Sequence, residues 1–461
     1  MLSQRAKEQN AWFLKAFERP LKRQSSSCSH NIDLATAENW CIRPEILALL
    51  KRNLKESFKA GDLSYAGGLG GTPILLGSLA AFFNSFFNPR VQVKPEHIVT
   101  GAGMSGILDS MISDTCDDGD GLLVSAPFWV LRNNVKLIPV YVPFHNSSSP
   151  EAVVAAYRTA ADEANTSLPE GRKVRGILFC NPHNPHGHLS PAGVLDGLLR
   201  LCEEKDLHFI SDEIYALSTF GSPTAESKQR TQAKERPGRG LQSPTREFVS
   251  VLSRNLKDLG VSPARVHLMY SVSKDLGCSG LRFGCLVTQS HKELRMSQAI
   301  LNNAKLCTAA AAMMAPIVAD TARMKTLMGL NLSRLRRAAS LAVAFAEFHG
   351  LTYYEPAAGL YIWLRLAKER DILETEKMND AGSSEADEEE AIVRACAKQG
   401  VLVGGGADYS ETQPGWFRLT FSLPEEQFLE GLRRIEEAMG YEERFPKTPR
   451  SMRLLRSFSC F

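Results

Sequence analysis

The chain has 461 residues, of which 44% are hydrophobic and 23% are charged, and its 54 basic and 51 acidic residues give a formal net charge of +3. This balance is typical of a globular protein of two or three domains and excludes collagen, coiled-coil and wholly disordered chains. The small net charge argues against a nucleic-acid binder, and the ten cysteines, none in a Cys-x-x-Cys pair, favour reduced thiols over a zinc ribbon.

The start of the chain, MLSQRAKEQNAWFLKAFERP, is charged and lacks the apolar core of a secretory signal, so we expect none. The most apolar stretch, residues 308–319, is too short to span a bilayer and is expected to form a buried helix. We therefore expect a cytoplasmic protein without a membrane or nucleic-acid partner.

Short apolar runs alternate with helical patterns between about residue 95 and residue 290. This alternation predicts a mostly parallel sheet with helices on both faces, whose ligands bind at the carboxyl ends of the strands. The predicted strands cover residues 97–100, 121–124, 176–180, 207–211, 266–271 and 283–287, and the predicted helices include residues 105–113 and 191–205.

The first motif at a strand end is Thr100-Gly-Ala-Gly103-Met104-Ser105, which lies between a predicted strand and a predicted helix. Small residues at a helix N-terminus let backbone N–H groups approach an anion, so we expect a phosphate there. A lone Gly-x-Gly is weak evidence by itself. Trp129 follows the next strand, and it is either a core aromatic or a side chain that stacks on a flat ring.

The sequence Asn181-Pro-His183-Asn184-Pro-His186-Gly-His188 follows the third predicted strand. Its two Asn-Pro steps predict a rigid, extended loop that holds the amide of Asn184 as a donor. The three histidines raise a metal site as an alternative. Because no carboxylate is spaced with them, we expect no metal in this protein.

Asp212 and Tyr215 follow the fourth predicted strand, in the sequence Phe209-Ile-Ser-Asp-Glu-Ile-Tyr215. A buried carboxylate at the edge of a sheet needs a cationic partner, and a protonated pyridine nitrogen is one. The alternative is an ordinary helix N-cap at Asp212.

Lys274 follows the fifth strand in Ser271-Val-Ser-Lys274, ahead of a glycine-containing loop with one arginine, Arg282. Such a lysine is either solvated or an amine held beside a carbonyl cofactor, where a depressed pKa makes it a nucleophile. Arg282 and the hydroxyls of Ser271 and Ser105 are expected to complete the phosphate shell.

A second pattern begins after residue 290 and predicts a smaller α+β domain. Arg418 lies in one of its strands, and an inward arginine there needs an anion such as a carboxylate. Residues 222–245 are expected to form an exposed insertion, and residues 380–390 an acidic loop. The predicted elements are helices 292–319, 330–348, 391–399 and 424–439 and strands 361–364, 401–403 and 416–421.

These motifs together indicate one ligand, which has a carbonyl for a lysine, a pyridine nitrogen for an aspartate, a phenolic oxygen, a phosphate and a carboxylate. Pyridoxal 5′-phosphate bound to an amino acid has all five groups. The chain, over about residues 30–440, resembles fold-type I pyridoxal-phosphate enzymes of the aminotransferase class I/II superfamily. It resembles most their 1-aminocyclopropane-1-carboxylate (ACC) synthase-like branch, through Ala35-Thr-Ala-Glu38-Asn39, Val266-His-Leu-Met-Tyr-Ser-Val-Ser-Lys274 and Pro414-Gly-Trp-Phe-Arg418.

The resemblance implies a role for each matching position around the cofactor. Lys274, Asp212 and Tyr215 are the implied catalytic residues: Lys274 forms the aldimine and moves the Cα proton, and Asp212 pairs with the pyridinium nitrogen. The other implied cofactor contacts are Asn184 and Tyr215 at the phenolic oxygen, Trp129 on the ring, and Gly103, Met104, Ser271 and Arg282 at the phosphate.

The resemblance also implies substrate contacts and an assembly. Arg418 binds the substrate carboxylate and Glu38 lies near the substrate. Tyr65 reaches the phosphate from the neighbouring subunit, which implies a homodimer with shared active sites.

The reaction is expected to be transamination of an α-amino acid, because Ser64–Pro73 and the residues after Trp129 differ from the usual ACC synthase pattern. The alternative is β- or γ-elimination by an ACC synthase-like enzyme or a C–S lyase. A remote alternative is a non-catalytic binding protein of the same fold, against which the intact Lys274 argues.

The predicted fold class is therefore α/β, with a large domain built on a mostly parallel sheet and a smaller α+β C-terminal domain. We expect an N-terminal segment over residues 1–50 that packs on the small domain. The large cofactor-binding domain is expected over residues 51–300, the small domain over 301–445 and a flexible basic tail over 446–461.

Overall fold

The computed structural model describes residues 7, 31–65, 67–129, 135–221, 240–241, 247–366 and 385–446, with backbone alone at 385–388. The predicted basic tail from residue 447 onward lies outside the described residues, as do all residues of the predicted insertion except 240 and 241.

A seven-stranded sheet forms the larger part of the molecule, with strand order β2-β9-β8-β6-β5-β3-β4. Strand β9 runs antiparallel to both of its neighbours, and the other pairs are parallel. The predicted mostly parallel sheet is therefore confirmed. The strands are β2 (Ile98–Ala102), β3 (Gly121–Ala126), β4 (Lys136–Tyr141), β5 (Val174–Cys180), β6 (His208–Asp212), β8 (Val266–Ser271) and β9 (Phe283–Thr288).

Strand β4 is the one member of this sheet that the sequence analysis missed. It is an edge strand with several exposed side chains and a proline, Pro139, so it lacks the continuous apolar run of a buried strand. Proline is tolerated at an edge because one side of the strand has no ladder to complete.

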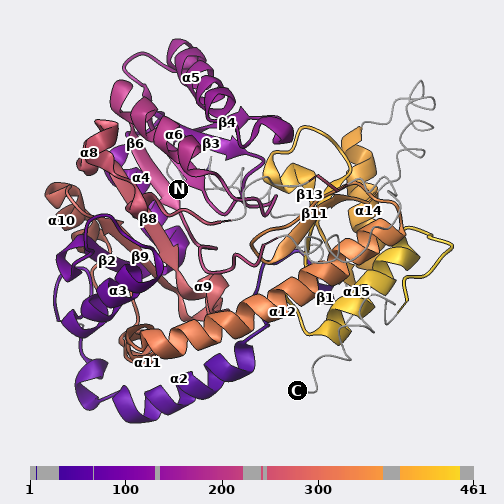
Figure 1. Cartoon of the computed structure of the whole chain (residues 1–461), viewed down its shortest axis with the longest axis horizontal. Coiled ribbons are helices and arrows are strands. Elements are labelled where there is room, and N and C mark those ends of the chain that lie inside the picture. Colours follow the sequence, from indigo (N-terminus) through magenta and orange to yellow (C-terminus); the bar gives the residue numbers. More distant parts are fainter. Residues whose placement is uncertain are drawn as a thin grey trace.

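Helices cover both faces of the sheet (Figure 1). Successive strand residues point to opposite faces, so Leu123 and Ile177 pack with α5 (Pro150–Ser167) and α6 (Ala192–Glu204), whereas Leu122 packs with α4 (Gly103–Thr115). We call the cluster that contains Leu123 and Ile177 the first core and the cluster that contains Leu122 the second core. The first core also includes residues of α3 (Pro73–Phe86) and α11 (Thr308–Ala319). These two helices pack against each other, and α11 also packs against α2 (Arg43–Ser57).

The predicted helix over residues 292–319 is in fact two helices, α10 (Lys292–Leu301) and α11. Asn302 caps the first one, and Ala304 adopts a positive φ of 56°, which ends the helical path. The predicted helix over 330–348 begins earlier, as α12 (Thr321–Phe348), because the Asp320 side chain accepts a hydrogen bond from the Arg323 N–H.

Helix α12 joins the two parts of the molecule. Figure 1 shows it (orange) running from α11 along one side of the molecule to the smaller part, where α14 and α15 lie. Met324 and Met328 belong to the first core, whereas Leu335 and Phe345 belong to the second, which lines the α4 face of the large sheet and continues into the smaller part. The predicted domain limits stay predictions, and this packing favours a boundary inside α12.

A five-stranded sheet with order β13-β14-β11-β10-β7 forms the smaller part. The strands are β7 (Gly240–Leu241), β10 (Tyr353–Tyr354), β11 (Tyr361–Arg365), β13 (Gly404–Gly405) and β14 (Trp416–Thr420), and the helices beside them are α14 (Glu385–Lys398) and α15 (Glu425–Ala438). The expected acidic loop is wrong from residue 385 onward, because α14 begins there; acidic residues suit the positive N-terminal end of a helix.

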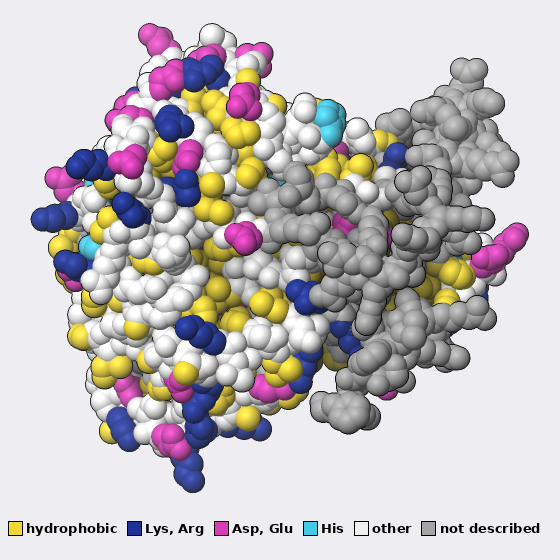
Figure 2. Space-filling model, in the orientation of Figure 1, with side chains coloured by type: hydrophobic (Ala, Val, Ile, Leu, Met, Phe, Trp, Pro, Cys, Tyr) yellow, Lys and Arg dark blue, Asp and Glu magenta, His cyan; other side chains and the backbone are white. Residues whose placement is uncertain are grey.

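The first described strand, β1 (Ile32–Asp33), pairs in parallel with β12 (Val401–Leu402) of the smaller part. The residues that follow β1 therefore run between the two parts of the molecule. Among the described residues, none of the helices has both the length and the apolarity needed to cross a bilayer. In the view of Figure 2, acidic and basic side chains lie intermixed over the large part.

Candidate active site

Lys274 lies in the single turn α9 (Val272–Asp275), directly after β8. The Ser271 hydroxyl accepts a hydrogen bond from the Ser273 N–H and so begins this turn. The Lys274 Nζ donates to the Ala37 carbonyl at 2.6 Å. Burial and then the charge of Arg418 lower the pKa of Lys274 to about 8, while two nearby carboxylates oppose this shift. A larger fraction of this amine than of a surface lysine is therefore neutral near pH 7, and the neutral form is the one that can accept a proton.

Asp212 is the last residue of β6, at the carboxyl end of the strand. Burial raises the pKa of its carboxyl group to about 6, against the hydrogen bond from the Ile214 N–H and the charge of Lys274. A carboxylate in this setting gains stability from a cation placed beside it.

Asp275, which the sequence analysis did not select, anchors the turn that carries Lys274. Its carboxylate accepts hydrogen bonds from the Ser218 hydroxyl at 2.6 Å, the Leu217 N–H at 3.0 Å and the Tyr270 hydroxyl at 3.1 Å. Burial raises its pKa to about 7. Nothing local in the sequence distinguishes this Asp from a solvated one, because its three partners come from other segments or from the preceding strand.

Arg418, on β14, is 4% exposed and holds its guanidinium between the rings of Tyr361 and Tyr409, whose centroids lie 5.0 and 4.9 Å away. Its Nη1 donates to the Asn184 Oδ1 at 3.0 Å, and its Nη2 donates to the Ala35 carbonyl at 2.6 Å. Its buried Nε has no partner within the described part of the chain.

The partners of Arg418 are thus neutral, and no carboxylate of the described residues forms an ion pair with it. A buried guanidinium without an anion is costly, so this position is prepared for an anionic ligand. Neither Tyr361 nor Tyr409 was selected from the sequence, because nothing local distinguishes a ring that flanks an arginine from a ring of the core.

Asn184 and Tyr215 lie close to this arginine. The Tyr215 ring packs edge-on to Tyr361 at 5.5 Å, and burial raises its pKa, which the charge of Arg418 opposes. The Tyr361 hydroxyl also donates to the His183 carbonyl at 3.3 Å, which ties the loop around Asn184 to β11.

The N-terminus of α4 and Arg282 form a second polar cradle. Gly103 has a φ of +75°, and a Cβ there would collide with the Arg282 guanidinium. Arg282 itself adopts a positive φ of 51° and donates to the Ser279 carbonyl at 2.9 Å. The backbone N–H groups of a helix N-terminus and a guanidinium together suit a phosphate. The Ser271 hydroxyl donates to the Phe283 carbonyl at 2.6 Å, so a phosphate contact requires it to turn.

Glu38 accepts hydrogen bonds from Ser279 at 2.9 Å and from Arg43 at 3.2 Å. Burial opposes its ionisation, but these two bonds and the charges of Arg43 and Lys274 lower its pKa overall. Glu38 is therefore an ionised carboxylate within electrostatic reach of Lys274.

The side chains of Trp129 and Tyr65 are exposed and are not packed into this group of site residues. Trp129, which follows the end of β3, is 51% exposed, and Tyr65 is 91% exposed. Their roles at the ring and across a subunit boundary stay predictions, as do the cofactor and substrate roles of the other predicted residues.

The residues present fit pyridoxal 5′-phosphate and an amino acid on three observations. Lys274 is a half-buried amine with a lowered pKa, the half-buried Asp212 has a raised pKa and gains from a cation, and the cradle at Gly103 has room only where glycine lacks a side chain. The unpartnered Nε of Arg418 adds a place for a carboxylate.

A model of the family described as aminotransferase class I and II matches residues 43–435. The chain is 55% identical over 452 residues to "Aminotransferase verI" of Clonostachys rogersoniana, covering 96% of this chain and 95% of the relative. It is 38% identical to "Probable aminotransferase gliI" of Aspergillus fumigatus, covering 96% and 97%.

More distant similarities extend in two directions. The chain is 29% identical to "1-aminocyclopropane-1-carboxylate synthase 7" of Arabidopsis thaliana, covering 80% of this chain and 76% of the relative. A solved structure of a Thermus thermophilus aspartate aminotransferase double mutant has a TM-score of 0.67 at 21% identity, covering 95% of this chain and 99% of that one. The second similarity shows the fold.

Proposed function

The chain belongs to the aminotransferase class I and II family, and on this premise we propose that it binds pyridoxal 5′-phosphate at Lys274 and transfers the amino group of an α-amino acid to a 2-oxo acid. It is an enzyme of this pyridoxal-phosphate-dependent class. The observation that carries the substrate class is Arg418, a buried cation whose described partners are neutral.

Pyridoxal 5′-phosphate, when bound, supplies a carbonyl carbon for the amino group and a ring that takes up the electrons of the Cα–H bond. Asp212 holds a proton on the ring nitrogen, because a buried carboxylate favours a cation beside it. The backbone N–H groups of Gly103 and Met104, with Arg282, bind the phosphate at the N-terminus of α4.

Lys274 then works as the base. Its pKa of about 8 leaves a useful fraction of neutral amine near neutral pH, and that amine removes the proton from the substrate Cα. Arg418 orients the substrate by pairing its guanidinium with the α-carboxylate, and Asn184 holds Arg418 in place through its Oδ1.

Elimination is a second candidate, which Glu38 favours. An ionised carboxylate within electrostatic reach of Lys274 is a second candidate base near the substrate, and the relative from Arabidopsis thaliana is named a 1-aminocyclopropane-1-carboxylate synthase. Product analysis separates the two reactions.

The experiment supplies the purified holoenzyme with a panel of amino acids, with and without a 2-oxo acid acceptor, and measures 2-oxo product and ammonia. Transamination gives product only with the acceptor and without ammonia. Lys274→Ala should abolish turnover, and Lys292→Ala, on the surface of α10, should not change it.

Ammonia formed together with 2-oxo product in the absence of an acceptor would replace transamination by elimination. Full turnover by the Lys274→Ala variant would remove this lysine from the mechanism. Turnover that does not depend on added pyridoxal 5′-phosphate, after the cofactor is stripped, would reject the cofactor assignment.

We propose in addition that the protein is a homodimer of the cytoplasm with shared active sites. The exposure of Tyr65 supports the shared site, because a tyrosine that is 91% exposed in one chain is free to contact a second chain.

A further inference from the structure

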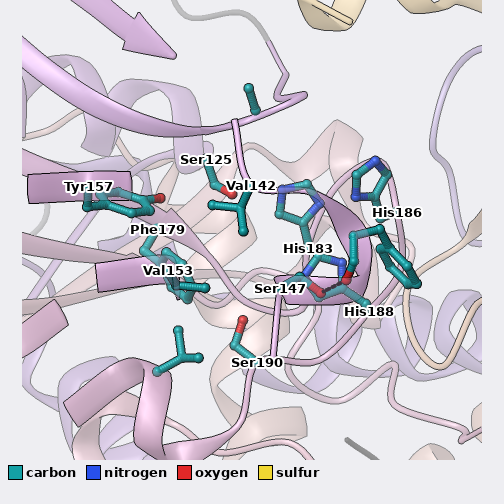
Figure 3. A pocket seen from close by; sticks show the side chains of 13 residues that line it. Ser125, Val142, Ser147, Val153, Tyr157, Phe179, His183, His186, His188 and Ser190 are labelled. Atoms are coloured by element: carbon teal, nitrogen blue, oxygen red, sulfur yellow. Dashed lines mark hydrogen bonds between the residues drawn. The ribbon is translucent and has the colours of Figure 1, made fainter. Parts of the chain in front are cut away.

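Three buried histidines meet in a cavity beside the loop that carries Asn184. His183, His186 and His188 are 2%, 7% and 7% exposed, and one ring nitrogen of each lies within 4.8 Å of the others. Figure 3 shows the three imidazoles gathered at one end of this cavity, with Tyr157 at the other end. It is the only such group of potential metal ligands within the described ranges.

The loop itself brings the three rings together. The His183 N–H donates to the His188 carbonyl at 3.0 Å, and the Gly187 N–H donates to the His183 carbonyl at 2.8 Å, so the segment closes into a tight turn. Gly187 has a φ of +70°, and a Cβ there would lie 2.8 Å from the Ala358 carbonyl oxygen, so glycine is required.

One nitrogen on each ring has no partner. The Nδ1 atoms of His183 and His188 and the Nε2 of His186 are buried and form no hydrogen bond. Buried polar atoms are normally satisfied, so three unpartnered nitrogens in one cavity require an explanation. A ligand that accepts all three lone pairs provides it.

The surroundings hold the rings as a metal site would. The rings of His183 and His188 stack with their centroids 4.7 Å apart, and the His183 backbone carbonyl accepts a hydrogen bond from the Tyr361 hydroxyl. The ring of His186 stacks on Tyr354 at 4.3 Å, and Phe144 packs edge-on to His186 and His188.

We propose that His183, His186 and His188 bind a divalent transition metal, with Zn²⁺ as the best fit and water as the fourth ligand. Three imidazoles and one open position are an established zinc arrangement. At a Zn–N distance of about 2.0–2.1 Å, tetrahedral nitrogens lie about 3.3 Å apart, so the rings need to close by about 1.5 Å at most. This proposal replaces the expectation of no metal, which relied on the absence of a spaced carboxylate.

The metal would act as a positioning group, because the cluster borders the Asn184 loop and the smaller sheet at once. Asn184 contacts Arg418, and the Tyr361 hydroxyl holds the His183 carbonyl. Tyr354, which stacks on His186, belongs to β10 of the smaller sheet. A bound metal would therefore fix the loop against both parts of the molecule. The binding of the metal does not depend on the proposed reaction.

The test uses the full chain without a histidine tag. Metal analysis after exhaustive dialysis should find about one zinc ion per chain, and Co²⁺ added to chelator-treated protein should give the visible absorption of a four-coordinate site. His188→Gln and His186→Gln should each lower the retained metal at least about tenfold. His208→Gln, at a half-buried histidine that hydrogen-bonds to His267, should retain it.

Folding is checked on each variant by circular dichroism. If the histidine variants fail to fold, the Co²⁺ spectrum and its loss on chelation in the wild-type protein decide the question. No retained metal together with no four-coordinate Co²⁺ spectrum would overturn the site. Metal content that is the same in the His186 and His188 variants as in the wild type would also overturn it, because the ion would then lie elsewhere.

Discussion

At the residue scale, Arg418 combines burial with neutral partners. Its guanidinium lies between two tyrosine rings, and its Nε has no described partner. A buried guanidinium with neutral partners is stabilised when an anion binds beside it, because its charge is then paired. Asn184 orients this guanidinium, because its Oδ1 accepts a hydrogen bond from the Arg418 Nη1.

We predict that Arg418→Lys raises KM for the amino acid at least about tenfold and leaves the affinity for pyridoxal 5′-phosphate unchanged. Lysine keeps the charge but loses the bidentate fork. Steady-state kinetics give KM, and equilibrium dialysis gives cofactor affinity. An unchanged KM with weakened cofactor binding would place Arg418 at the cofactor instead.

Glu213, beside Asp212, illustrates a different cost of burial. Its Oε1 accepts hydrogen bonds from the Val251 N–H at 2.7 Å and the Ser211 hydroxyl at 2.9 Å, while its Oε2 has no partner. Burial raises its pKa from 4.5 to about 8, although these bonds oppose the shift. The folded state therefore holds a proton that the unfolded state releases.

We predict that this proton makes stability fall with rising pH. The stabilisation is complete below about pH 4.5 and is lost as the pH rises towards 8, at up to about 1.4 kcal/mol per pH unit. Glu213→Gln should flatten the dependence of the unfolding free energy on pH between 6 and 8, as measured by urea denaturation. The exposed Glu293→Gln is the control, and an equal slope in wild type and Glu213→Gln would contradict the prediction.

At the element scale, the N-terminus of α4 depends on one glycine. Gly103 begins the helix with a positive φ, and the Arg282 guanidinium fills the space of its missing side chain. Gly106, one turn later in the same helix, faces no such crowding, because a Cβ there would lie 3.6 Å from the Cβ of Ala102.

We predict that Gly103→Ala weakens binding of pyridoxal 5′-phosphate at least about tenfold, because the methyl group displaces Arg282 and strains the backbone. Gly106→Ala should keep the affinity and stabilise the helix, since alanine is favoured over glycine in a helix interior by about 1 kcal/mol. Equilibrium dialysis and thermal melts measure the two effects. Equal cofactor affinity in both variants would exclude α4 as the phosphate site.

At the scale of the whole molecule, the active site combines segments from distant parts of the chain. Residues 35–38 pass between the two sheets and supply a carbonyl to Lys274 and another to Arg418. Helix α12 packs against α3 and α11 of the large part and against β11 of the smaller part, so a movement of one part against the other changes the site.

We predict that a Tyr65→Ala chain and a Lys274→Ala chain complement each other in a mixed dimer. Heterodimers form about half of a statistical mixture and carry one site with both native residues, so activity should rise towards about a quarter of wild type. Activity is measured after subunit exchange that a labelled chain confirms. No recovery despite proven exchange, or a monomer in sedimentation, would show that Tyr65 does not act across a subunit boundary.

Local patterns in the sequence were enough to predict the mostly parallel sheet and its strand ends. Strand β8 has the predicted limits, Val266–Ser271, because a mostly apolar run of six residues is shorter than a typical helix and has the length of a buried strand. The same ends carry Asp212 and Lys274, whose chemistry is visible in their motifs. Strand β4, an edge strand with mixed exposure, lacked such a pattern and was missed.

The contacts that turn these motifs into a site were decided by the tertiary structure. Lys274 meets the Ala37 carbonyl across 237 residues, and Arg418 meets Asn184 across 234 residues. The flanking tyrosines of Arg418 have no local signature at all, and the spacing of the three histidines suggested a metal site without showing that their rings meet in one cavity. Periodicity and motif spacing report what a segment does by itself, whereas contacts between distant segments depend on how two cores pack around α12, which only the folded chain determines.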